Sequence, residues 1–99
     1  MDVIREDLAE AVDKELHEAE KNFGLFNSQH EKYAVMLEEF CEAEEDLKRL
    51  DAMLNSAWDM VRHDELISDM ADAIYHTAIN AAVECCQLAA MARKGYKND

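Results

Sequence analysis

The chain has 99 residues, of which 49% are hydrophobic and 33% charged, a composition that is typical of one small globular domain over residues 1–99 and excludes a two-domain enzyme. It contains no proline and only two glycines, which excludes Gly-rich phosphate loops and most hairpin turns and favours an all-α fold. Its formal net charge of -13 repels nucleic-acid phosphates and anionic membrane surfaces, so we expect neither of them as a partner.

The first predicted helix runs from about Asp2 to Asn22, and Gly24 is its expected C-terminal cap. Its first ten residues, MDVIREDLAE, contain acids and no apolar stretch, so we expect neither a signal peptide nor a transit peptide. The apolar residues recur at helical spacing: Ile4, Leu8, Ala11, Val12, Leu16, Ala19 and Phe23.

The second predicted helix is long and runs from Gln29 to about Arg62. Ser28, followed by Glu31 three residues later, predicts a capping box at its start. An unbroken helix of this length spans about 50 Å, so it either breaks near Asn55 and Ser56 or projects into a partner subunit. Its predicted apolar stripe, which we interpret as core or dimer interface, consists of Tyr33, Met36, Phe40, Ala43, Leu47, Leu50, Leu54, Trp58 and Val61.

After a predicted turn at His63 and Asp64, the third helix is expected from about Glu65 to Arg93, with Gly95 as its stop. Its apolar face is rich in alanine, which permits close approach of another helix. This face consists of Ile67, Met70, Ala71, Ile74, Ala78, Ala81, Cys85, Leu88, Ala89 and Ala92. We therefore predict a bundle of three main helices, with room for a fourth short one, completed by assembly into a homodimer or homotetramer.

The most informative segment for chemistry lies in the second helix, where Glu38, Glu42 and Glu45 line up on one helix surface with Glu39 beside them. Carboxylates spaced in this way repel one another. One interpretation is a solvated acidic face, which is the default for so acidic a chain. The other is a site for a hard cation such as Mg²⁺ or Mn²⁺, which prefers oxygen ligands and removes the repulsion.

Two stretches of the chain, residues 30–42 (HEKYAVMLEEFCE) and 78–92 (AINAAVECCQLAAMA), resemble the MazG-like, all-alpha NTP pyrophosphatase superfamily in a small phage or bacterial form. The resemblance covers roughly residues 28–94. It implies a Mg²⁺-dependent enzyme, with Mn²⁺ as the alternative ion, that cleaves a nucleoside triphosphate to monophosphate and pyrophosphate.

The family motifs EExxE and ExxD fall on Glu38, Glu39 and Glu42 and then on Glu84 and Gln87. The resemblance implies Glu38, Glu42 and Glu84 as metal ligands and Glu39 as a ligand or as the catalytic, water-orienting base. Gln87 stands where the family motif has aspartate. This departure removes one anionic ligand and predicts weaker metal binding, an altered metal number or loss of catalysis.

Three further features leave alternatives open. Asp69 and Asp72 form a DxxD on the third helix that could substitute for the second motif, although we prefer Glu84 because it borders the apolar stripe. His76 is expected to be a surface residue in a hydrogen-bonded pair. The rival function is a non-enzymatic acidic helical protein, either a partner-binding module or a mimic of DNA charge, which explains the charge of -13 without a metal.

Three cysteines are an odd number, and the adjacent Cys85 and Cys86 cannot easily bridge, so we expect a reducing, cytoplasmic location. Cys85 is expected in the core and Cys86 is expected to be the more exposed of the two. No run approaches the roughly 18 apolar residues of a membrane span.

Overall fold

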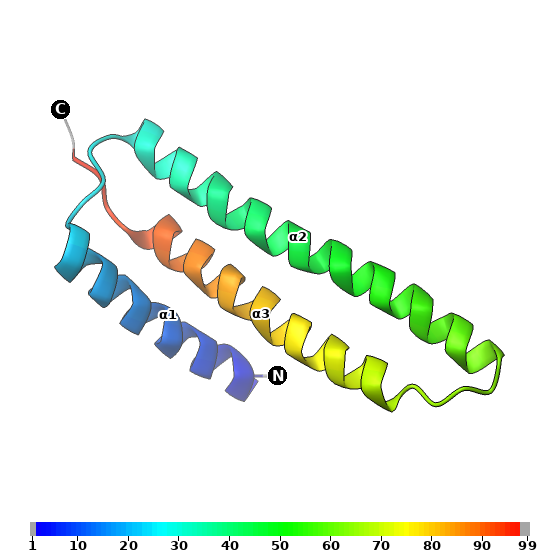
Figure 1. The fold of residues 1–99 in the computed structure, drawn as a ribbon. Helices are drawn as coiled ribbons and strands as arrows, with labels where there is room; N and C mark the ends of the chain where they lie inside the picture. Colours follow the sequence, from blue (N-terminus) through cyan, green and yellow to red (C-terminus); the bar gives the residue numbers. More distant parts are fainter. Residues whose placement is uncertain (1, 98–99) are drawn as a thin grey trace.

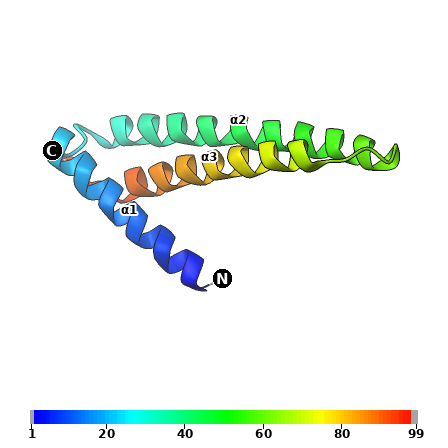
Figure 2. The same cartoon turned by 60° about the horizontal axis from the view of Figure 1, so that its bottom comes forward.

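The computed structural model describes residues 2–97 and consists of three helices: α1 (Asp2–Phe23), α2 (Gln29–Arg62) and α3 (Ser68–Arg93). α2 and α3 form a long antiparallel hairpin, and α1 packs on α3 (Figure 1). Turned by 60°, the molecule shows α1 diverging from the hairpin toward the N-terminus (Figure 2). The predicted all-α, three-helix fold is confirmed, and residues 2–97 contain no fourth helix.

The two ends of the α1–α2 loop follow the predicted local signals. Gly24 has a φ of +67°, the left-handed conformation that favours glycine, and so ends α1. Ser28 caps α2, because its Oγ accepts from the Glu31 backbone N–H at 3.1 Å. The Glu31 carboxylate accepts from the backbone N–H of Asn27 at 3.2 Å. In a standard capping box it would accept from the N–H of Ser28, so the reciprocal bond here is shifted by one residue.

α2 is one unbroken helix, so the predicted break near Asn55 and Ser56 does not occur. The chain is elongated as a result, with extents of 61 × 28 × 21 Å and a radius of gyration of 17.5 Å, against about 13 Å for a compact domain of this length. Its accessible surface of 7593 Å² exceeds by about 1,900 Å² the surface of a globular monomer of the same mass. A single copy therefore buries little of its own surface.

The turn after α2 has the hydrogen bonds of a Schellman motif, with Asp64 in the left-handed position at φ 56°. The Glu65 N–H donates to the Met60 carbonyl at 2.9 Å, and the Asp64 N–H donates to the Val61 carbonyl at 3.1 Å. The backbone N–H of Glu65 thus belongs to the C-terminal cap of α2. For this reason α3 begins at Ser68, three residues after the predicted start at Glu65.

Gly95 does not stop α3 in the way that was predicted, because its φ lies outside the left-handed region. Lys94 ends the helix in an extended conformation. A Cβ at Gly95 would lie 3.2 Å from Leu25 Cδ2, so glycine here allows the C-terminal segment to approach the α1–α2 loop. The Phe26 N–H donates to the Gly95 carbonyl at 3.0 Å and the Lys97 N–H donates to the Phe26 carbonyl at 2.8 Å, which joins the two segments.

α2 meets α3 along a row of side chains that we call the seam, spaced alternately by three and four residues as in a coiled coil. All of its members are buried or half-buried: Met36, Glu39, Ala43, Asp46, Leu50, Met53, Ala57 and Met60 on α2, facing Met70, Ile74, Thr77, Ala81, Glu84, Leu88 and Met91 on α3. The buried alanines of the seam allow the two helices to lie close together.

The aromatic side chains of α2 and several of its aliphatic ones lie outside the seam, in a row that we call the outer stripe: Tyr33, Leu37, Phe40, Leu47, Leu54, Trp58 and Val61. Phe40 is 49% exposed and Trp58 61% exposed. Their interpretation as the core of one copy is therefore wrong, whereas Met36, Ala43 and Leu50 of the predicted stripe do face α3. Within the described residues, none of the helices is long and apolar enough to cross a lipid bilayer.

Candidate metal centre

Three carboxylates from two helices meet at one edge of the seam. Glu39 and Glu42 lie one turn apart on α2, and the antiparallel arrangement places Glu84 of α3 opposite them. One oxygen from each of the three carboxylates lies within 4.8 Å of the others. Glu39 and Glu84 are half-buried and Glu42 is exposed, so the cluster lies at the edge of the helix interface.

The side-chain amide of Gln87 lies beside these three carboxylates. With its nitrogen turned toward the carboxylates, Gln87 donates to Glu39 Oε2 at 3.2 Å and to Glu84 Oε2 at 3.1 Å, and this orientation satisfies both ends of the amide. The four residues therefore form one polar layer, in which a neutral donor bridges two acids. An aspartate at this position would instead bring a fourth negative charge.

The crowded acids raise two pKa values. For Glu39, partial burial is the main cause that raises the carboxyl pKa, and the charges of Glu42, Glu38 and Glu15 add to it. For Glu84, a hydrogen bond with the Glu42 carboxyl is the main cause that raises the pKa, followed by partial burial and by the charges of nearby acids. Both carboxyl groups thus hold protons more tightly than ordinary glutamates, and their charged forms repel the neighbouring acids. A bound cation would offset this repulsion.

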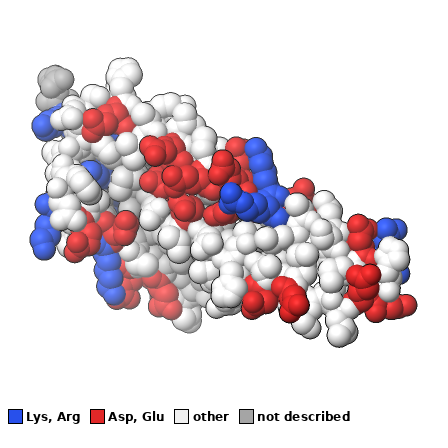
Figure 3. Space-filling model, viewed as in Figure 1, with Lys and Arg blue, Asp and Glu red and all other residues white. Residues whose placement is uncertain are grey.

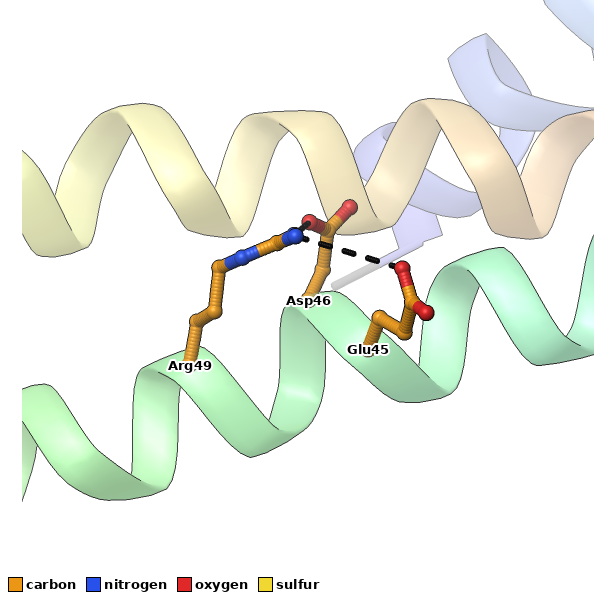
Figure 4. Close-up of polar contacts among 3 residues, drawn as sticks. All are labelled: Glu45, Asp46 and Arg49. Atoms are coloured by element: carbon orange, nitrogen blue, oxygen red, sulfur yellow. Dashed lines mark hydrogen bonds and ion pairs between the residues drawn. The ribbon is translucent and has the colours of Figure 1, made fainter.

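Asp46, one turn further along the seam, has its own cation. Arg49 Nη1 contacts Asp46 Oδ1 at 2.7 Å, and Arg49 Nη2 lies 3.9 Å from Glu45 Oε2 (Figure 4). The guanidinium compensates a carboxylate that is only 9% exposed. No role was expected for Asp46. The alternating spacing of three and four residues along the seam is the signal that could have placed it at the interface.

The remaining predicted residues lie outside the cluster. Glu38 is exposed on the outward flank of α2 and is not one of the three converging acids, although its charge acts on Glu39. Asp69 and Asp72 are exposed, and Asp72 Oδ2 lies 3.7 Å from His76 Nε2, which makes the two residues neighbours on the surface but is too long for the hydrogen-bonded pair expected for that histidine. The preference for Glu84 over the DxxD pair therefore agrees with the geometry. Acidic side chains gather over the part of the hairpin nearest the α1–α2 loop, with basic ones beside them (Figure 3).

The donor set fits a hard divalent cation in chemistry and nearly in spacing. Carboxylate and amide oxygens are ligands that Mg²⁺ and Mn²⁺ accept. Two oxygens bound to one Mg²⁺ lie at most about 4.2 Å apart, because each Mg–O distance is about 2.1 Å. A spread of up to 4.8 Å therefore requires the three carboxylates to close by a fraction of an ångström. Gln87 would have to turn its amide so that Oε1 faces the ion.

The cysteines take no part in this layer. Cys41 and Cys85 are exposed and Cys86 is half-buried, so the predicted order of exposure for the adjacent pair is wrong. Both Cys85 and Cys86 line the groove between α3 and α1.

Comparisons of this chain with protein-family models, with curated proteins and with solved structures give no match.

Proposed function

We propose that this protein is a metal-dependent nucleoside triphosphate pyrophosphohydrolase of the MazG-like kind that the motifs resemble. The observation that carries the proposal is the convergence of Glu39, Glu42 and Glu84, which come from the two resembling segments, within 4.8 Å. Residues 45 positions apart in the chain thus meet in one acidic layer. An acidic protein also needs cations before an anionic nucleotide can bind.

The proposed reaction is attack of water on the α-phosphorus. The new P–O bond forms as the bond between the α-phosphorus and the bridging oxygen to the β-phosphorus breaks, so pyrophosphate leaves and a monophosphate remains. Mg²⁺ or Mn²⁺ would neutralise phosphate charge and activate the attacking water. Glu42 and Glu84 would hold the ion, and Glu39, whose raised pKa suits a general base, would accept the proton from the water or serve as a ligand.

One observation favours the rival function, a non-enzymatic acidic helical protein that binds another protein or imitates DNA charge. The Gln87 amide already donates to two of the three acids, so the layer is partly satisfied without an ion. The net charge of -13 then serves recognition of a basic partner. The two functions differ in one measurable property, the metal-dependent release of pyrophosphate.

The test is a screen of ribo- and deoxynucleoside triphosphates with Mg²⁺ or Mn²⁺, reading pyrophosphate and monophosphate. We expect release by the wild type, and a gain in rate or a lower metal requirement in Gln87→Asp, which supplies the fourth anionic ligand. Glu84→Gln should lose activity while remaining helical. Glu44→Gln is the matched control, because Glu44 lies on exposed α2 surface outside the cluster. Failure of both the wild type and Gln87→Asp on all substrates would reject the enzyme in favour of the acidic binding protein.

The proposal includes assembly into a homodimer or homotetramer through the outer stripe, in the cytoplasm. The excess surface of about 1,900 Å² per chain is within the range that obligate partners bury. The outer stripe follows the same heptad spacing as the seam, which is the pattern that helices use to pack on one another. A second copy supplies an identical stripe and is therefore the simplest occupant.

A further inference from the structure

A pocket of about 520 Å³ opens at the end of the molecule where α1, the α1–α2 loop, the start of α2 and the C-terminal segment meet. We call it the Lys94 pocket. Its volume lies in the range of small-molecule sites. Apolar side chains of all three helices line it, together with a few charged groups; those that matter here are Glu15, Phe23, Val35, Met91, Lys94 and Lys97.

Lys94 is the unusual residue of this pocket, because only 5% of its surface is exposed. Its Nζ lies 4.3 Å from the centre of the Phe26 ring and 5.9 Å from that of Phe23. Among residues 2–97, no carboxylate lies within 4.0 Å of this ammonium. Two aromatic rings, and no carboxylate of the described residues, therefore lie next to this ammonium, which leaves it able to pair with an anionic ligand.

The Lys94 ammonium remains reachable from the pocket. No side-chain nitrogen or oxygen in the described part of the chain is both fully buried and unpartnered, so Nζ keeps a small accessible surface. A second cation is close by, because Lys97 lines the same pocket and donates to Asn27 Oδ1 at 3.2 Å. Asn27 in turn donates two hydrogen bonds to the Glu31 carboxylate, one from its backbone N–H and one from its side chain. Glu31, one of the two acids that line the pocket, is therefore already hydrogen-bonded. Two ammonium groups in one pocket suit a ligand with several anionic oxygens.

The pocket lies one helical turn from the carboxylate cluster along the seam. Val35 precedes Glu39 by one helical turn on α2, and Met91 follows Gln87 by one turn on α3. One turn is about 5.4 Å, so the layer that lines the pocket is next to the layer that holds the carboxylates. Glu15 joins the two, because it lines the pocket and its charge raises the pKa of Glu39. One ligand can therefore occupy both places.

We infer that the Lys94 pocket binds the two outer phosphates of the nucleotide, with Lys94 and Lys97 paired to their oxygens while the α-phosphate lies at the carboxylate layer. This inference rests on the proposed function and assigns the end of the substrate that leaves as pyrophosphate. It places two basic side chains of this acidic chain beside the phosphates that leave as pyrophosphate.

The test uses inorganic pyrophosphate as the probe, titrated calorimetrically into the full chain with and without Mg²⁺. We expect Lys94→Met, which keeps the aliphatic stem on Phe26 but removes the charge, to weaken pyrophosphate binding about 10- to 100-fold. Lys94→Arg should retain most of the binding. Lys48→Met is the matched control, because it removes the same charge from an exposed side chain paired with Glu44 and should leave binding unchanged. If Lys94→Met fails to fold, Lys97→Met, at an exposed position, should still weaken binding about two- to five-fold.

The outcomes separate this inference from the proposed function. Absence of pyrophosphate binding, or equal binding by the wild type, Lys94→Met and Lys97→Met, would overturn the inference even if nucleotides are hydrolysed. Binding that depends on Lys94 in a protein that hydrolyses no nucleoside triphosphate and gains no thermal stability from metal would support the pocket as a phosphate site and overturn the pyrophosphohydrolase.

Discussion

The two apolar faces of α2 differ in the size of their side chains and in what they contact. The seam buries Ala43 and Ala57 against α3 and carries acids among its apolar residues. The outer stripe carries larger groups such as Phe40 and Trp58, and these remain about half or more exposed. The comparison shows that the face with the largest apolar side chains is not the face that packs on the neighbouring helix.

The physical reason lies in the distance between helix axes. Alanines at the contact let α2 and α3 approach closely, and the closely packed backbones gain dispersion contacts along the whole hairpin. Large side chains at those positions would hold the helices apart. The outer stripe then keeps its apolar side chains exposed, whereas the seam, with its acids, is closed by α3. Four measurements sharpen or break this contrast.

The largest effect is expected on the outer stripe. Leu47→Glu combined with Leu54→Glu should convert an assembly of several copies into a monomer of 11.3 kDa with a lower melting temperature, because two charges would have to be buried at the interface. Light scattering measures the mass directly. The control, Ser56→Glu, adds negative charge at an exposed position of the same helix on the side turned away from the stripe and should keep the wild-type mass. A wild type that is itself monomeric at concentrations on the order of tens of micromolar would break the comparison.

The second effect concerns the close packing of the seam. Ala57→Leu should destabilise the fold by about 1–3 kcal/mol, because the added side chain cannot fit between α2 and α3 without moving them apart. This corresponds to a fall in melting temperature of roughly 4–8 °C per kcal/mol for a chain of this size. Ala52→Leu makes the same change at an exposed position of α2 and should leave the melting temperature nearly unchanged. Equal effects at both positions would mean that the seam is not close-packed.

The third effect concerns the acidic layer of the seam. Without metal, Glu42→Gln should melt a few degrees above the wild type, because it relieves repulsion on the order of 0.5 kcal/mol between neighbouring acids. Added Mg²⁺ or Mn²⁺ should raise the melting temperature of the wild type by mass action but not that of Glu42→Gln. Thermal unfolding with and without the ion measures both. An identical metal response in the two proteins would make the layer a solvated acidic face.

The smallest effect is the pH dependence of folding that Glu39 and Glu84 cause. Both pKa values are raised in the folded protein, so the folded state binds more protons than the unfolded state between the ordinary glutamate value of about 4.3 and the raised values. Stability should therefore increase as the pH falls through this window, and decrease again as the pH rises through it. The Glu39→Gln, Glu84→Gln double variant should lose this component. If the double variant keeps this pH-dependent component of stability, other acids cause it.

Part of the candidate site could be predicted from local spacing. Glu39 and Glu42 share a helix turn whatever the fold does, and Gly24 and Ser28 mark the helix ends through backbone conformation and capping alone. The inclusion of Glu84 was predicted from the family resemblance and agrees with the geometry of the antiparallel hairpin. Glu38 was grouped with these acids because it lies one helical turn before Glu42 and opens the EExxE motif, yet Glu38 and Glu39 point about 100° apart and only Glu39 faces α3.

Amino-acid sequence by itself determined the all-α class and the places where α1 and α2 begin and end, because these follow from helical periodicity, capping residues and the lack of proline. Tertiary structure decided which face of α2 meets α3, which acids converge and that Lys94 is buried against Phe26. These depend on contacts between residues distant in the chain, and both faces of α2 satisfy the same helical period. Only the packing distance to α3 distinguishes them.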